Sequence, residues 1–369
     1  MPCVRLLLPL LLGLGCRPVT GASPPPCPRA TEPDPTPDGL AGPEQQRRAR
    51  GLAALDAGHF DLARAEFAAI LAVTPGNLAA RTLFDAATRA LIAAQERAAT
   101  SFATATPIVV AAPPWRHTVV RALAIAATSP PELVSLSARP NTGTDEAEWF
   151  RRHGLRLPEY EVPNPMRGLP GNLPPAIAPS FGAYLLVQAI AHRDHTILIY
   201  GPSYSGGRFV AVLDAHGQRI AFLDFDAHRQ APAAPAAEST AVEQHVIWAE
   251  VAEGVLYISH GHDDPRDDMT GYISALDVTS GALRWRSDPG VASAATFAIH
   301  GGHILAGHGS AAGPARVFVL DRRTGTVVGQ ARLASAPEYL FVQGDRLLVR
   351  SHTTDHVFEL RQKRARGGR

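Results

Sequence analysis

Residues 275–285 constrain the fold more than any other part of the chain, because they read as two short strands joined by a tight turn. Asp277 can accept hydrogen bonds from the turn backbone, and Gly281 can adopt the left-handed conformation that closes such a hairpin. Trp285 follows the turn and would face a neighbouring element. Similar units surround this one, so the stretch predicts a repeated antiparallel architecture.

The pattern formed by Ala275, Asp277, Gly281 and Trp285 resembles the tryptophan-docking motif of quinoprotein-type (PQQ-like) β-propellers. Ser280 stands where that family usually has Thr. The resemblance implies that Trp285 packs between two propeller blades.

A second, degraded copy of the motif lies further along the chain. Asp321 and Gly325 repeat its turn, whereas Gly329 occupies the position of the tryptophan. Units that align with these two copies recur between residues 183 and 361 at a period of about 45 residues, which favours four-stranded propeller blades. We therefore expect a mainly β protein, a β-propeller of about four to five blades preceded by a small α-helical hairpin.

The last of the aligned units ends at Leu360 after only three strands. In a closed ring the missing strand must come from upstream, which would also remove an exposed sheet edge. Residues 118–126 are our candidate for that strand, and residues 132–138 also read as a strand. We thus expect residues 100–182 to be a connecting segment that contributes a propeller strand, and residues 229–240 to be a surface loop.

Residues 44–99 have the Ala, Leu and Arg content and the apolar spacing of helices. Their small and aromatic residues resemble a single tetratricopeptide (TPR) repeat, in the order Gly51, Gly58, Phe60, Ala63, Phe67 and Pro75. A third helix is predicted from Leu78 to about Arg97. One such repeat cannot bury its apolar face unaided, so the unit either docks on the rest of the chain or binds a partner.

Residues 1–15 have the anatomy of an export signal, with a basic start at Arg5 and an apolar run that follows. Residues 12–16 resemble a bacterial lipoprotein signal, which implies lipidation of Cys16 and a membrane anchor. Residues 16–43 are rich in Pro and predict an extended linker. The alternatives are cleavage after Ala22, which gives a secreted protein, and a chain that is not exported. We expect a periplasmic or outer-membrane-anchored lipoprotein.

The three cysteines of the chain, Cys3, Cys16 and Cys27, all precede residue 28. The globular part can therefore contain neither a disulfide nor a thiolate metal site. The net charge of +1 gives no general attraction to nucleic acid, and the basic residues 362–369 read as a disordered end.

Three histidines, His260, His308 and His352, fall at nearly equivalent places at the ends of second strands. Repeat geometry could bring them together on a divalent metal or an anionic ligand, or they could simply satisfy backbone groups at strand ends. Four carboxylates in the loop that follows the first of them could bind calcium or form a solvated loop: Asp263, Asp264, Asp267 and Asp268.

The sequence contains no phosphate loop, nucleophile elbow, zinc-protease motif or dinucleotide glycine pattern. We therefore expect a non-enzymatic binding or scaffold protein that recognises a protein partner in the cell envelope through its propeller, with no cofactor. The alternatives are a PQQ-dependent dehydrogenase and a metal-dependent hydrolase that uses the propeller histidines. Quinoprotein dehydrogenases normally need an adjacent pair of cysteines beside the cofactor, and this chain has no cysteine after Cys27.

Overall fold

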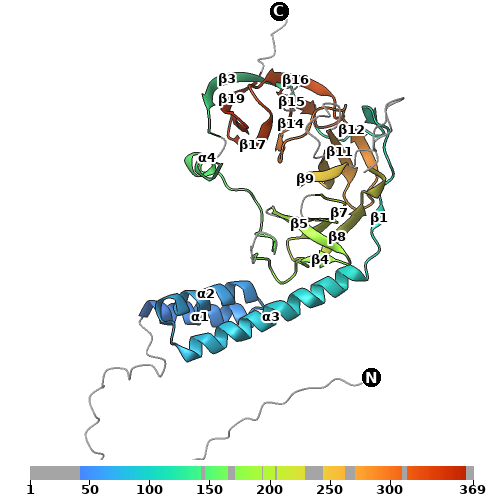
Figure 1. Ribbon diagram of the computed structural model, residues 1–369. Coiled ribbons are helices and arrows are strands. Elements are labelled where there is room, and N and C mark those ends of the chain that lie inside the picture. The colour runs from blue at the N-terminus through green and yellow to red at the C-terminus, as the bar shows by residue number, and fades with distance from the viewer. Residues whose placement is uncertain are drawn as a thin grey trace, which may run out of the picture.

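The computed structural model describes residues 42–142, 146–164, 171–192, 194–203, 206–228, 244–261, 271–309 and 314–362 of the 369-residue chain. A helical unit comes first in the sequence, and four sheets follow around an arc (Figure 1); they are antiparallel except where β1 pairs with β8 in parallel. The protein is mainly β, and its sheets are the four blades of a β-propeller. None of the helices within the described ranges has the length and apolar character needed to cross a membrane.

The helical unit consists of α1 (Gly42–Asp56), α2 (Phe60–Val73) and α3 (Leu78–Ala103). Helices α1 and α2 approach closely because Gly51 has no side chain: a Cβ at that position would lie 2.5 Å from Cε1 of Phe67. Arg50 and Glu66 form an ion pair at 2.8 Å across the same two helices. The core of the unit is apolar and comprises Ala63, Phe67, Ile70, Ala80 and Ala87.

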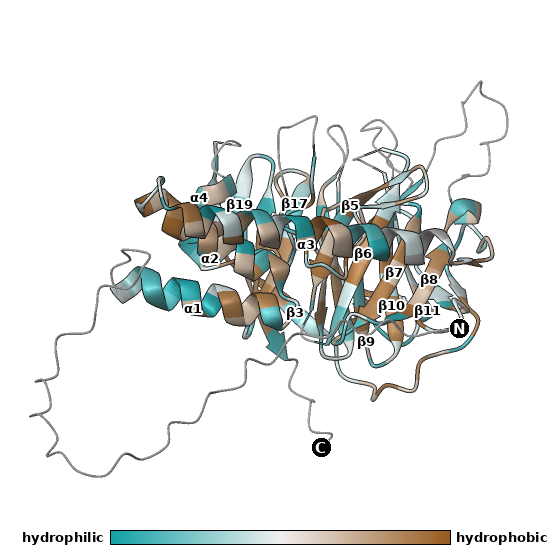
Figure 2. Cartoon of the chain, turned by 90° about the horizontal axis from the view of Figure 1, so that it is seen from below, coloured by the Kyte–Doolittle hydropathy of each residue, from teal (hydrophilic) through white to brown (hydrophobic). Residues whose placement is uncertain are grey.

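Helix α3 connects this unit to the propeller. It is longer than the sequence predicts, and Ala98 in its last turns packs against the core of the first blade. Figure 2 shows α3 lying across that blade, whose strands are largely apolar. The helical unit is thus joined to the propeller by contact as well as by the chain.

The first blade, in sheet order, is β1 (Ile108–Val109), β8 (Arg219–Asp224), β7 (Phe209–Asp214), β6 (His195–Gly201), β5 (Tyr184–Ala191) and β4 (Ser180–Phe181). The second is β2 (Thr118–Val119), β12 (Leu283–Arg286), β11 (Tyr272–Asp277), β10 (Val255–Gly261) and β9 (His245–Ala252). A short 3₁₀ turn, Asp226–His228, follows β8. Apolar side chains of these two blades and of the third form one continuous core.

The third blade is β13 (Ala298–His300), β14 (His303–His308), β15 (Arg316–Asp321) and β16 (Val327–Arg332). The fourth is β17 (Pro337–Gln343), β18 (Arg346–Ser351), β19 (Thr354–Gln362) and β3 (Pro131–Pro140). An upstream strand therefore completes the last blade, as expected from the three strands of the final unit.

The predicted identity of that upstream strand is wrong. Strand β3 pairs with β19 along its whole length, from Pro131 opposite Gln362 to Pro140 opposite Thr354. Residues 118–126 instead add the two-residue β2 to the outer edge of the second blade, and Leu123 donates to a carbonyl of the third blade at 3.1 Å. Both segments have strand-like patterns, and the longer one can supply more backbone hydrogen bonds to the nine-residue β19.

Helix α4 (Glu146–His153) lies on the inner strand of the fourth blade. Trp149 is 1% exposed, and its ring lies 6.1 Å from that of Phe341. Phe150 contacts the rings of Phe341 and Tyr339 edge to face at 5.6 and 5.2 Å. From α4 the chain runs to the first blade, so α4 stands on the side where the arc of blades is open (Figure 1).

Candidate functional site

The turn of the docking motif is held by Asp277. Its Oδ1 accepts hydrogen bonds from the backbone N of Ser280 at 3.0 Å and from Ser280 Oγ at 2.9 Å. Its Oδ2 pairs with Arg284 at 2.7 Å. These donors lower the pKa of Asp277 to about 2, the backbone hydrogen bond from Ser280 being the largest cause. Gly281 has a φ of +68°, so the hairpin closes in the left-handed conformation.

Trp285 is fully buried and faces the third blade. Its Nε1 donates to the carbonyl of Arg322 at 2.9 Å. A methyl group at Gly325 would overlap the indole ring, so the ring lies directly on the turn between β15 and β16. Ala275, opposite Trp285 in the sheet, is also buried. The indole thus links the second and third blades.

The degraded copy of the motif keeps its turn. Oδ1 of Asp321 accepts from the backbone N of Arg323 at 2.7 Å, and the N–H of Gly325 donates to the Asp321 carbonyl at 2.7 Å. Gly325 has a φ of +70°. Trp285 of the second blade packs on this turn.

The three histidines proposed for a metal site have different surroundings. His260 is buried and stacks on His228 at 5.0 Å, His308 ends β14, and His352 is an exposed residue that pairs with Glu338 at 3.0 Å. Within the described ranges, no group of three His, Cys, Asp or Glu side chains is arranged to hold a metal ion. A metal role for these histidines stays a prediction. Cys16 and the four aspartates at 263–268 lie outside the described residues.

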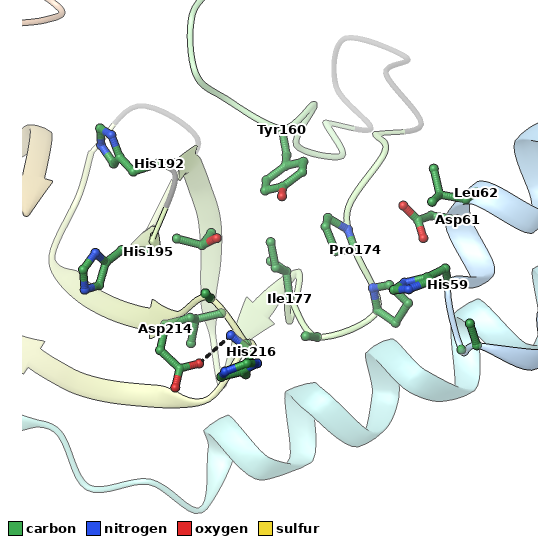
Figure 3. Close-up of a pocket in the computed structure, with 18 residues that line it drawn as sticks. His59, Asp61, Leu62, Tyr160, Pro174, Ile177, His192, His195, Asp214 and His216 are labelled. Atoms are coloured by element: carbon green, nitrogen blue, oxygen red, sulfur yellow. Dashed lines mark hydrogen bonds between the residues drawn. The ribbon is translucent and has the colours of Figure 1, made fainter. Parts of the chain in front are cut away.

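A pocket of about 630 Å³ lies where the helical unit meets the first blade (Figure 3). The turn between α1 and α2 forms one wall with Ala57, Gly58, His59, Asp61 and Leu62. The connecting segment contributes Tyr160, Pro174, Pro175, Ala176 and Ile177. The first blade contributes His192, His195, Thr196, Leu213, Asp214, Ala215, His216 and Gly217.

The pocket combines an apolar floor with polar walls. Ile177 and Leu213 are buried, whereas Leu62 at the helical wall is 56% exposed. Asp214 fixes the opposite wall, because its Oδ1 accepts from the backbone N atoms of His216 and Gln218 at 2.9 and 2.8 Å (Figure 3). Such a site can enclose an apolar side chain and hydrogen-bond the groups around it.

The pocket includes four histidines that the sequence analysis did not single out: His59, His192, His195 and His216. Burial lowers the pKa of His192, which therefore favours its neutral form. These residues lie at turns and strand ends of three segments that are distant in the sequence, and no common spacing relates them. The sequence alone does not show that the turn between α1 and α2 lies beside the first blade. Without that knowledge, nothing groups these four histidines.

No protein-family model and no curated protein sequence matches the chain. Among solved structures, BamB from Moraxella catarrhalis is similar over 47% of this chain and 58% of its own, with 15% identity and a TM-score of 0.28. A europium-containing methanol dehydrogenase is similar over 32% of this chain and 26% of its own, with 16% identity and a TM-score of 0.22. The Dos1 propeller is similar over 52% and 56%, with 9% identity and a TM-score of 0.27. The chain thus covers less than two thirds of each of these structures.

Proposed function

We propose that this chain is an exported, membrane-anchored, non-enzymatic binding protein that recognises an extended segment of a protein partner in the cell envelope. The observation that carries the proposal is the pocket between the helical unit and the first blade. Three segments far apart in the sequence build it, and each is fixed by its own packing or hydrogen bonds.

The composition of the pocket supports a peptide ligand. Its floor of Ile177, Leu213 and two prolines suits an apolar side chain, and its histidines offer both donors and acceptors for peptide groups. Leu62 leaves more than half of its side chain exposed beside this floor, and an exposed apolar residue at the rim of a pocket is typical of an interaction surface.

Site-specific photo-cross-linking tests the pocket. A photoreactive residue replaces Leu62 on one wall or His216 on the opposite wall, and Leu78, an exposed helical residue outside the pocket, is the matched control. We expect both pocket positions to yield an adduct with the same protein and Leu78 to yield none. Equal adducts from Leu78, or none from either wall, would contradict the proposal.

A second experiment supports or refutes the anchor. With Cys16 lipidated, the wild-type chain incorporates labelled fatty acid and sediments with membranes. Replacing Cys16→Ser should release the protein into the soluble envelope fraction, because the acyl chains supply the membrane affinity. Cys27→Ser is the matched control, and its distribution should equal that of wild type. Unchanged sedimentation of Cys16→Ser would exclude this anchor.

A further inference from the structure

Three arginine side chains are buried among the described residues: Arg286, Arg322 and Arg350. Two of them are paired. Arg322 donates to the Tyr257 hydroxyl at 2.8 Å and forms an ion pair with Glu253 at 3.3 Å. Arg350 forms an ion pair with Glu338 at 3.0 Å. A buried guanidinium normally has such partners, because an unpaired buried charge loses its hydration without compensation.

Arg286 is different. It has no exposed surface, and its Nε, Nη1 and Nη2 have no hydrogen-bond partner in the part of the chain that the structure describes. Two aromatic rings lie against the guanidinium: its Cζ lies 3.8 Å from the ring centroid of Tyr272 and 4.6 Å from that of Trp115. Cation–π contacts stabilise the charge from the faces of the rings but leave every N–H of the guanidinium without an acceptor.

Two further buried polar atoms of the same blade, one in Ser274 and one in His260, lack a hydrogen-bond partner among the described residues. Ser274 lies directly opposite Arg286 on the neighbouring strand, and its buried Oγ has no hydrogen-bond partner among the described residues. Tyr272, two residues before Ser274, lies opposite His260, whose Nε2 is also buried without a described partner. The side chains of Arg286, Ser274 and His260 thus point to the same face of the second blade.

The first blade supplies the opposite wall of the cluster. His228 stacks on His260 with ring centroids 5.0 Å apart, and Phe225 lies 5.8 Å from the same ring. Nε2 of His228 lies 3.1 Å from the Ala111 carbonyl. A carbonyl only accepts, so His228 carries its proton on Nε2 and is held in a fixed orientation. His228 therefore positions the His260 ring and does not itself offer a donor to the cluster.

The charge of the cluster is positive at neutral pH. Burial lowers the pKa of Arg286 to about 10, which still leaves the side chain protonated. Burial and the charge of Arg286 both lower the pKa of His228, to about 3, and the same two causes contribute to the low pKa of His260. Both histidines are neutral, and the guanidinium is the charge that requires a counterpart.

We infer that Arg286, Ser274 and His260 form a binding site for an oxyanion, the carboxylate or phosphate group of a small ligand, between the first and second blades. The N–H edge of the guanidinium is the part that can bind such a group in bidentate fashion. The Ser274 hydroxyl and the His260 ring add neutral donors beside it. Trp115, which is half-buried, covers the guanidinium from the side of the connecting segment.

Thermal unfolding and titration calorimetry of the full chain test the site, with acetate or phosphate replacing chloride at constant ionic strength. An anion that binds only the folded state raises the unfolding temperature in a saturable way. We expect such a rise with at least one of the two anions in wild type. A response to acetate alone assigns a carboxylate, and a response to phosphate alone assigns a phosphate group.

Variants separate binding from folding. Arg286→Met should abolish the anion response, whereas Arg322→Met, which removes a buried arginine that is already paired, should keep it. Arg286→Lys and Ser274→Ala are milder changes that take the place of Arg286→Met if that variant does not fold. We expect the lysine variant to bind the anion about tenfold more weakly, because it loses the bidentate fork. Absence of any saturable response in wild type, or an unchanged response in the Arg286 variants, would overturn the inference.

Discussion

The indole Nε1 of Trp285 in the second blade donates to the carbonyl oxygen of Arg322 in the third blade at 2.9 Å. Nε of the same Arg322 donates to the hydroxyl of Tyr257 in the second blade at 2.8 Å. Each blade thus provides both a donor and an acceptor to the other, and both hydrogen bonds are buried. The pair fixes how these two sheets are oriented, because neither bond tolerates rotation of one blade against the other.

Trp285→Ala should lower the free energy of unfolding by about 3–5 kcal/mol, the usual cost of truncating a buried Trp. Trp285→Phe should cost less, because a ring still fills the interface while the donor to Arg322 is lost. Urea unfolding followed by circular dichroism measures both values. A loss below about 1 kcal/mol for the alanine variant would show that the indole does not hold the blades together.

Gly325→Ala tests the surface on which the indole packs. The new methyl group would overlap Trp285, and the φ of +70° adds backbone strain. Gly344→Ala is the matched control, because its φ is +62° and nothing lies within 4 Å of an added Cβ. We expect about 1–2 kcal/mol of destabilisation for Gly344→Ala from backbone strain alone and a larger value for Gly325→Ala. Equal losses in chemical unfolding would contradict the packing argument.

Gly51→Ala should destabilise the helical unit, although alanine is the better helix former by about 1 kcal/mol. The added Cβ would lie 2.5 Å from Cε1 of Phe67, and overpacking of this kind costs about 1–3 kcal/mol. Gly42→Ala in the same helix meets nothing within 4 Å and should not destabilise. Phe67→Leu should reduce the penalty of Gly51→Ala in a double-mutant cycle measured by thermal unfolding. Additive effects would show that the two residues do not meet.

Glu250 makes stability depend on pH. Burial raises its pKa from 4.5 to about 7, with Trp248 donating to its Oε1 at 3.4 Å. The folded chain therefore binds this proton more tightly than the unfolded chain, so the free energy of unfolding falls as pH rises from about 4.5 to about 7. Glu250→Gln should remove this fall and stabilise the protein relative to wild type at pH 8. Urea unfolding at pH 5 and pH 8 checks the difference, and parallel pH profiles for both proteins would exclude the effect.

The sequence predicts the blades well because their information is local. Asp277 and Gly281 specify a turn from within a few residues, and alternating apolar side chains specify the strands beside it. No local pattern tells which upstream segment forms the outermost strand of the last blade. Residues 118–126 and 131–140 both suit a sheet edge, and the choice between them depends on where the chain passes once the blades are stacked.

The candidate pocket and the Arg286 cluster are harder to predict than the blades, because their residues meet only through tertiary contacts. His59 and His216 line the same pocket because α3 docks on the first blade. Arg286 follows Trp285 directly in the sequence, and a strand of alternating side chains places the two on opposite faces of the blade. Nothing in the composition of β12 distinguishes an arginine that is buried from one that is solvated.

The pairing of β3 with β19 joins segments that are far apart in the chain, as the 214-residue separation of the hydrogen-bonded Asn141 and Asp355 shows. At a synthesis rate of about 5–20 residues per second, β3 would wait on the order of ten seconds or longer for its partner strand to leave the ribosome. During that time its backbone and the exposed Leu136 are open to other strands. Until β19 is available, β3 is an unpaired strand of the kind that promotes association between chains.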